Sequence, residues 1–161
     1  MDEPLAYLLT WHTYGTWLHG DERGSVDRVH NTPETPFNPP DDRRLRQTAS
    51  RMRHSAVVLH DADRAIVEQA IQDHGRVRGW PIHAIAVRSN HIHVVVENSG
   101  VAPERVMAQF KAWATRRLRE SGRAVATERV WVDEGSTRYL WKQQSVADAV
   151  RYVEEGQDVP R

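Results

Sequence analysis

The stretch WPIHAIAVRSNHIHVVVE, residues 80–97, contains the clearest strand pair in the chain. Two largely apolar runs, 80–88 and 91–97, flank Ser89-Asn90, which is a tight-turn pair. We therefore expect an antiparallel hairpin here. Alternate side chains share one face of a strand, so three residues of the second run are expected to point into the core: Ile92, Val94 and Val96.

The sequence that precedes this hairpin predicts one strand, one long loop and one helix. Aromatic and β-favouring residues at 5–14 predict the strand. Prolines and a lack of periodicity predict a surface loop over about 21–42. Asp61 is expected to cap a helix that continues to Arg78. The residues expected to face inward from that helix are Ala65, Ile66, Gln69, Ala70 and Val77.

After the hairpin, residues 103–120 carry the strongest helical periodicity. Two short strands, 130–132 and 139–141, are expected around Gly135, and a last helix over about 145–155. The inward positions of the helix over 103–120 are Val106, Met107, Phe110, Trp113, Ala114 and Leu118.

This order of elements predicts an α+β fold: a ferredoxin-like antiparallel sheet with two helices on one face plus a C-terminal tyrosine-bearing helix. The terminal helix is surplus to the ferredoxin-like pattern. It is expected to lie on the other face of the sheet or to swap to a partner. A length of 161 residues fits a single domain over 1–161.

Composition excludes several classes of protein. The absence of cysteine rules out disulfides, thiolate metal sites and cysteine nucleophiles. No apolar run reaches a membrane-spanning length and no signal-peptide pattern is present, so we expect a cytoplasmic protein without a membrane partner. The 22 basic and 22 acidic residues cancel, but the basic residues are nearly all arginine, whose fork grips phosphate with two hydrogen bonds. A GC-rich genome would also explain that excess of arginine.

His91 and His93 are the clearest candidates for chemistry. They lie two residues apart on the predicted strand and so point the same way, opposite to its apolar face, with Glu97 further along the same side. Two imidazoles on a rigid strand are well placed to hold a divalent metal from one side. The alternative is a surface or structural histidine pair. The remaining histidines, His12 among them, have no ligand spacing and are expected to be incidental.

Tyr152 is the candidate nucleophile. At 100° per residue, it lies about 120° from the centre of the apolar stripe of the last helix, so its hydroxyl can face a sheet edge or a cleft. A phenol with a pKa near ~10 is a weak nucleophile unless a cation polarises the group it attacks. A metal held by two histidines can do so as a Lewis acid on a phosphodiester. Ordinary amphipathic packing is the alternative for Tyr152.

A His-hydrophobic-His strand motif followed about 60 residues later by a helix-borne tyrosine resembles the single-tyrosine HUH transposases. This family comprises small insertion-sequence transposases and REP-associated tyrosine transposases. Residues 88–93 are similar to its metal-ligand strand, 110–118 to the helix that follows, and 152–157 to the end of its tyrosine helix. The resemblance implies DNA transposition by a metal-dependent single-stranded DNA endonuclease and strand-transferase.

The resemblance also assigns roles and partners. His91 and His93 would coordinate Mg²⁺ or Mn²⁺, and Tyr152 would attack phosphorus, forming a 5′-phosphotyrosine intermediate and leaving a free 3′-hydroxyl. The partner would be single-stranded DNA, often beside a hairpin. Such enzymes commonly act as homodimers, and the tyrosine helix is used in cis or in trans.

The chain departs from the family pattern at one position. The family places a third metal ligand, usually Gln or Asn, four residues after the tyrosine, where this chain has Gly156. Gln157 and Glu155 are the remaining candidates for that ligand. The departure supports an alternative function: a domesticated, catalytically impaired relative that binds structured single-stranded DNA or RNA. A histidine-pair phosphoesterase would need two His-x-Ser/Thr motifs, and the sequence has only one, His30-Asn31-Thr32.

Basic and aromatic residues outside the motif are candidates for DNA contacts. Arg23 and Arg28 follow the first strand, and Lys111 and Arg116 belong to the basic segment 105–123. Exposed aromatic side chains stack on bases. The tryptophans expected near strand ends are Trp11, Trp17 and Trp141.

Overall fold

The computed structural model describes residues 2–15 and 57–155. The loop expected over about 21–42 lies outside them. The elements, in chain order, are β1 (Ala6–Thr13), α2 (Asp61–Arg78), β2 (Ile82–Val87), β3 (His91–Glu97), α3 (Pro103–Glu120), the short 3₁₀ helix η1 (Ala124–Ala126), β4 (Trp131–Leu140) and α4 (Gln143–Glu154).

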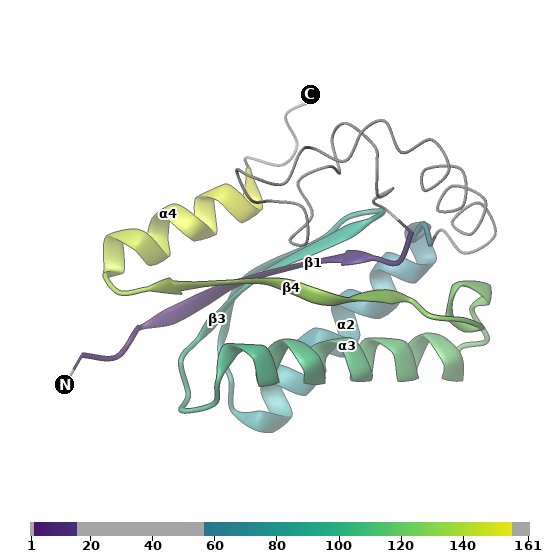
Figure 1. Cartoon of the computed structure of the whole chain (residues 1–161), viewed down its shortest axis with the longest axis horizontal. Coiled ribbons are helices and arrows are strands. Elements are labelled where there is room, and N and C mark those ends of the chain that lie inside the picture. Colours follow the sequence, from purple (N-terminus) through teal and green to yellow (C-terminus); the bar gives the residue numbers. More distant parts are fainter. Residues whose placement is uncertain (1, 16–56, 156–161) are drawn as a thin grey trace, which may run out of the picture.

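The four strands form one antiparallel sheet in the order β2-β3-β1-β4. Helices α2 and α3 cover one face of this sheet, and α4 lies on the other (Figure 1). This arrangement confirms the α+β, ferredoxin-like prediction and places the surplus helix on the opposite face. The two central strands, β1 and β3, pair directly, so residues far apart in the sequence become neighbours on the sheet.

The main core lies between the sheet and the pair α2 and α3. One face of β1 and β3 contributes the side chains on the sheet side of this core. Most of the apolar residues predicted to face inward from α3 contribute on the helix side. Burying one such large apolar side chain contributes about 1.5–3 kcal/mol. Fully buried members include Leu9, Trp11, Val67, Ile71, Ile92, Val94, Phe110 and Leu118.

Helix α2 has the predicted length, but its cap and inward face differ from the prediction. His60, not Asp61, is the N-cap, and a capping box joins it to Asp63. Three residues expected to face inward are exposed: Ala65, Gln69 and Val77. Two polar residues, Asp63 and His74, are buried in their place, so the hydrophobic pattern alone gives the wrong rotation of the helix.

Strand β4 is continuous through Gly135, so the prediction of two short strands around this residue is wrong. A Cβ at Gly135 would lie 2.5 Å from the sulfur of Met107 and 2.7 Å from the carbonyl oxygen of Thr10. The glycine is therefore needed for close packing of β4 against α3 and β1, not for a turn. Nearby, the register with β1 shifts between Trp11 and Thr13, which marks a bulge in the strand pair.

Helix α4 packs on a second, smaller core on the other face of the sheet. The helix begins at Gln143, two residues earlier than expected, after its N-cap Lys142. The buried residues of this core are small or medium in size: Ala6, Leu8, Ala84, Val95, Leu140, Ala149 and Val153. Among the described segments, no helix combines the length and apolar character that crossing a membrane requires.

Candidate active site on the α4 face of the sheet

His91 and His93 lie on the face of β3 that α4 partly covers. Their ring centroids are 4.9 Å apart. His93 is buried, with 6% of its surface exposed, and His91 is partly buried. The strand therefore presents both imidazoles on the same side, as the alternation of the sequence predicts.

The Nδ1 atom of each imidazole has a polar partner. Thr10 Oγ1 lies 2.8 Å from Nδ1 of His93, and Asn90 Oδ1 lies 2.8 Å from Nδ1 of His91. Because Asn90 Oδ1 can only accept, His91 Nδ1 carries the proton and donates it. Contacts of this kind orient imidazoles that bind metals, with Nε2 as the ligating atom. The surroundings of both histidines thus fit a metal-binding role.

Burial favours the neutral form of two imidazoles at this site, those of His93 and His12. Desolvation, together with the neighbouring charges of His91, His12 and Arg88, lowers the pKa of His93 from 6.5 to about 4. Burial and His91 also lower the pKa of His12. A neutral imidazole is the form that binds a metal, so His93 is ready to do so at neutral pH without first losing a proton.

His12 belongs to this cluster, although its sequence context gave no indication of a role. It is the direct cross-strand partner of His91, and the two ring centroids are 5.6 Å apart. The prediction that His12 is incidental rested on ligand spacing along the chain. The signal that could have placed it is the pairing of β1 with β3, which brings residues 12 and 91 together.

Tyr152 reaches the same site from α4. Its ring lies 5.5 Å from that of His93, nearly perpendicular to it, and 42% of the residue is exposed. Both side chains line a cleft of about 520 Å³ between α4 and β4. The floor of the cleft is Leu8, Thr10 and His93; β4 contributes Ser136, Arg138 and Leu140, and α4 contributes Ser145, Asp148, Ala149 and Tyr152.

The described residues supply two histidines for a metal but no complete ligand set. Within residues 2–15 and 57–155, no three His, Asp or Glu side chains gather in a way that could hold an ion. Glu155 is exposed, and its carboxylate lies 3.8 Å from Arg151 Nε. Gln157 and Gly156 lie outside the described residues. Glu97, on the same face of β3, lies 3.4 Å from His83 Nε2.

The other predicted DNA contacts are not gathered at this cleft. Lys111 and Arg116 belong to α3, which packs on the opposite face of the sheet. The Arg116 guanidinium lies over Trp113 and bonds Glu120. Arg23, Arg28 and Trp17 lie outside the described residues. Trp11 is fully buried, so the idea that it stacks on bases is wrong, whereas Trp141 is 49% exposed.

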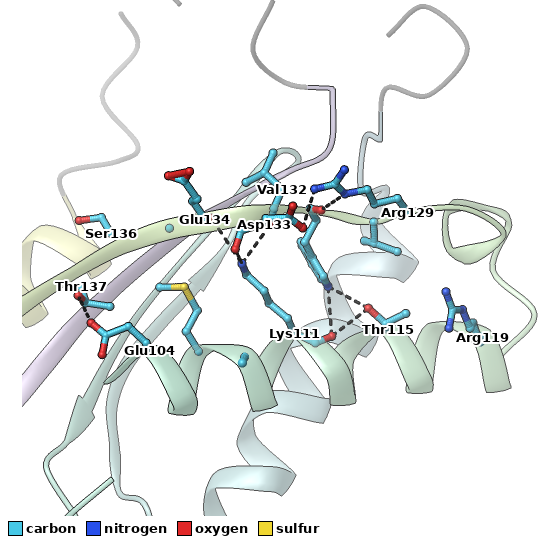
Figure 2. A pocket seen from close by; sticks show the side chains of 15 residues that line it. Glu104, Lys111, Thr115, Arg119, Arg129, Val132, Asp133, Glu134, Ser136 and Thr137 are labelled. Carbon is cyan, nitrogen blue, oxygen red and sulfur yellow. Dashed lines mark hydrogen bonds and ion pairs between the residues drawn. The ribbon is translucent and has the colours of Figure 1, made fainter. Parts of the chain in front are cut away.

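A larger cavity, about 940 Å³, lies between α3 and β4 on the side away from the histidines (Figure 2). Lys111 extends across it, and Nζ donates to the carbonyls of Val132, Asp133 and Glu134 at 3.0–3.4 Å. Trp131 Nε1 donates back to the carbonyl of Lys111. These contacts hold the bulged part of β4 against α3. We therefore assign this cavity a structural role.

A protein-family model covers the part of the chain that carries the histidine pair and the helix-borne tyrosine. Residues 48–155 match the family model described as "Transposase IS200 like". The chain belongs to the IS200-like transposase family. The match spans the described histidine strand and ends just beyond the tyrosine helix. None of the proteins with curated descriptions matches this transposase significantly.

Two solved structures share the fold of the transposase. A putative transposase from Deinococcus radiodurans superposes with a TM-score of 0.54 at 14% identity, covering 96% of the transposase and 92% of that chain. A REP-associated tyrosine transposase bound to a REP hairpin gives a TM-score of 0.54 at 12% identity, covering 94% of this chain and 65% of the other. At these identities the likeness shows the fold.

Proposed function

We propose that this transposase is a metal-dependent single-stranded DNA endonuclease and strand-transferase in which Tyr152 is the nucleophile. The observation that carries the proposal is the contact of Tyr152 with His93, 5.5 Å between ring centroids, at an open cleft. Membership of a transposase family supports DNA as the substrate. No other tyrosine of the described residues lines this cleft.

In the proposed reaction, the Tyr152 oxygen attacks the phosphorus of a phosphodiester. An O–P bond to the tyrosine forms, and the bond from phosphorus to the 3′-oxygen breaks. The phenolic proton passes to solvent, and the departing 3′-oxygen takes up a proton from solvent. The products are a 5′-phosphotyrosine and a free 3′-hydroxyl strand end. Attack by such a hydroxyl on the phosphotyrosine reverses these bond changes and joins the strands, so no high-energy cofactor is needed.

His91 and His93 are the residues that would hold Mg²⁺ or Mn²⁺, each through Nε2. When bound, the cation would supply Lewis-acid polarisation of the scissile phosphate. Thr10 and Asn90 orient the imidazoles through Nδ1. Two imidazoles alone favour Mn²⁺ over the oxygen-preferring Mg²⁺, so activity is expected to be higher in Mn²⁺.

The test is a covalent adduct on a denaturing gel. Labelled single-stranded DNA carrying the flanks of the gene is incubated with protein in Mn²⁺, in Mg²⁺ or in chelator. We expect an adduct that requires metal and is lost in Tyr152→Phe and in His91→Ala. Tyr139→Phe is a matched control, because Tyr139 is exposed to a similar degree but lies on the other face of β4. An adduct that persists in Tyr152→Phe would disprove the proposal.

A second function is favoured by the incomplete ligand set of the described residues and by Gly156 in the sequence. In that case the protein binds structured single-stranded nucleic acid without cutting it. A hairpin substrate is supported by the solved relative bound to a REP hairpin. Binding of a hairpin-bearing strand in a native gel, with no adduct in any metal, would favour this second function. We expect a homodimer in either case, which light scattering of the purified protein tests.

A further inference from the structure

The cleft beside Tyr152 is lined by a positively charged side chain that has no role in the proposed reaction. Among the residues that line it, Arg138 is the only cation. Arg138 is exposed on β4 and pairs across the sheet with Leu8, while Ser136 pairs with Thr10. Its side chain therefore points to the same face as His93, about 7 Å along the strand from Ser136.

Arg138 differs from most arginines of the described chain in having no carboxylate partner. Seven others are ion-paired: Arg64, Arg76, Arg116, Arg117, Arg123, Arg129 and Arg151. Within residues 2–15 and 57–155, no hydrogen bond or ion pair engages the guanidinium of Arg138. An unpaired guanidinium keeps its full capacity for a bidentate bond to an anion.

The opposite wall of the cleft carries the opposite charge. Asp148 on α4 lines the cleft, and its Oδ1 accepts a hydrogen bond from Gln144 Nε2 at 2.8 Å. A polyanion in the cleft is repelled by that wall and attracted by the β4 wall. The charge asymmetry therefore directs a phosphate backbone along β4, past Arg138, which lies two residue pairs along the sheet from the row of Thr10 and His93.

We propose that Arg138 binds the backbone phosphate next to the one that Tyr152 attacks. The inference rests on the proposed function, because it takes single-stranded DNA as the occupant of this cleft. Binding at Arg138 fixes the register of the strand, so that one particular phosphodiester faces the tyrosine hydroxyl. Arg138 is thus a substrate-positioning residue of the site.

Binding is measured in the Tyr152→Phe background, so that the strand stays intact. Fluorescence anisotropy with a single-stranded oligonucleotide gives Kd over a range of salt concentrations. Arg138→Gln is expected to weaken binding about tenfold and to reduce the magnitude of the salt slope by about 0.7, the effect of one lost contact to a single strand. Arg105→Gln is the matched control, because Arg105 is also exposed and unpaired but lies on α3.

The position of the contact is tested by replacing single phosphates of the oligonucleotide with neutral methylphosphonates. With Arg138 present, one substitution beside the scissile phosphate is expected to weaken binding. In Arg138→Gln the same substitution is expected to have no further effect, because the partner is already gone. Additive losses at every position would overturn the inference.

The outcomes separate the inference from the proposed function. If Arg138→Gln binds single-stranded DNA as tightly as the parent, or if Arg105→Gln loses as much affinity as Arg138→Gln, the inference fails while the tyrosine chemistry stands. If Arg138-dependent binding is seen but unmodified protein forms no adduct, the proposed cleavage fails alone. If the protein does not bind single-stranded DNA even at low salt, both fail.

Discussion

Thr10 of β1 and His93 of β3 are direct cross-strand partners, and Thr10 Oγ1 lies 2.8 Å from His93 Nδ1. The hydroxyl holds the imidazole ring from the side opposite to Nε2. A buried imidazole fixed in this way has little freedom to rotate away from a ligand. The contact between two central strands therefore sets the orientation of the histidine nearest to Tyr152.

We expect Thr10→Val to weaken Mn²⁺ binding about tenfold, because the isosteric valine keeps the packing but removes the hydrogen bond to His93. Isothermal titration calorimetry measures the affinity. Thr137→Val is a suitable control, since the Thr137 hydroxyl bonds Glu104 on the other face of the sheet. Equal affinities for Thr10→Val and the parent would show that the hydroxyl does not orient the ligand.

The pH dependence of folding follows from the lowered pKa of His93. The unfolded histidine takes up a proton near pH 6.5, but the folded one does so only near pH 4. Between these values the unfolded state binds more protons, so stability is fully present above pH 6.5 and falls as the pH approaches 4. The loss is on the order of 3 kcal/mol at most.

Urea unfolding in chelator, from pH 7.5 to 4, measures this decline. A His93→Gln variant is expected to show a flatter profile over the same range, whatever its absolute stability. His83→Gln is the control, because His83 is not buried in the cluster. A decline of the same steepness in His93→Gln would assign the effect to other groups.

Gly135→Ala is expected to destabilise the fold by about 1–3 kcal/mol, because its Cβ would overlap Met107 and the Thr10 carbonyl. Urea unfolding gives the free energy. The cost should be smaller in a Met107→Ala background, where one of the two obstacles is removed. An alanine tolerated at no cost would mean that β4 can move away from α3.

Arg123→Gln is expected to destabilise the protein by about 2 kcal/mol. Arg123 Nε lies 2.6 Å from Oδ1 of Asp63, whose side chain is only 1% exposed, so the change leaves a buried carboxylate with one fewer partner. Arg116→Gln is the matched control, because its pair with Glu120 is exposed and contributes about 0.5 kcal/mol or less. Thermal unfolding of both variants under one condition compares them, and equal losses would contradict the assignment.

The parts of the site that could be predicted from the sequence are those fixed by local periodicity. Alternation along a strand puts His91 and His93 on one face, and the helical repeat puts Tyr152 off the apolar stripe. The structure confirms both placements. The fold could also be predicted from the sequence, because this order of strands and helices is compatible with only a few topologies.

The rest of the site depends on contacts between segments distant in the sequence. His12 and Arg138 enter the site only through the register of β1 with β3 and β4, which no local pattern encodes. The pattern does not predict the inward face of α2, because Asp63 and His74 are polar yet buried, each with a partner outside that helix. The break expected at Gly135 failed because the glycine serves close packing.

Helix α4 carries the tyrosine but contributes only to the smaller of the two cores, where its own buried residues are Ala149 and Val153. Burial of such small side chains stabilises a helix less than burial of leucine, phenylalanine and tryptophan. Local opening of α4 therefore requires less free energy than unfolding of the sheet with α2 and α3. The free energy of global unfolding, measured with heat or denaturant, consequently depends mainly on the main core. The position of the tyrosine depends instead on the smaller free energy of local opening of α4.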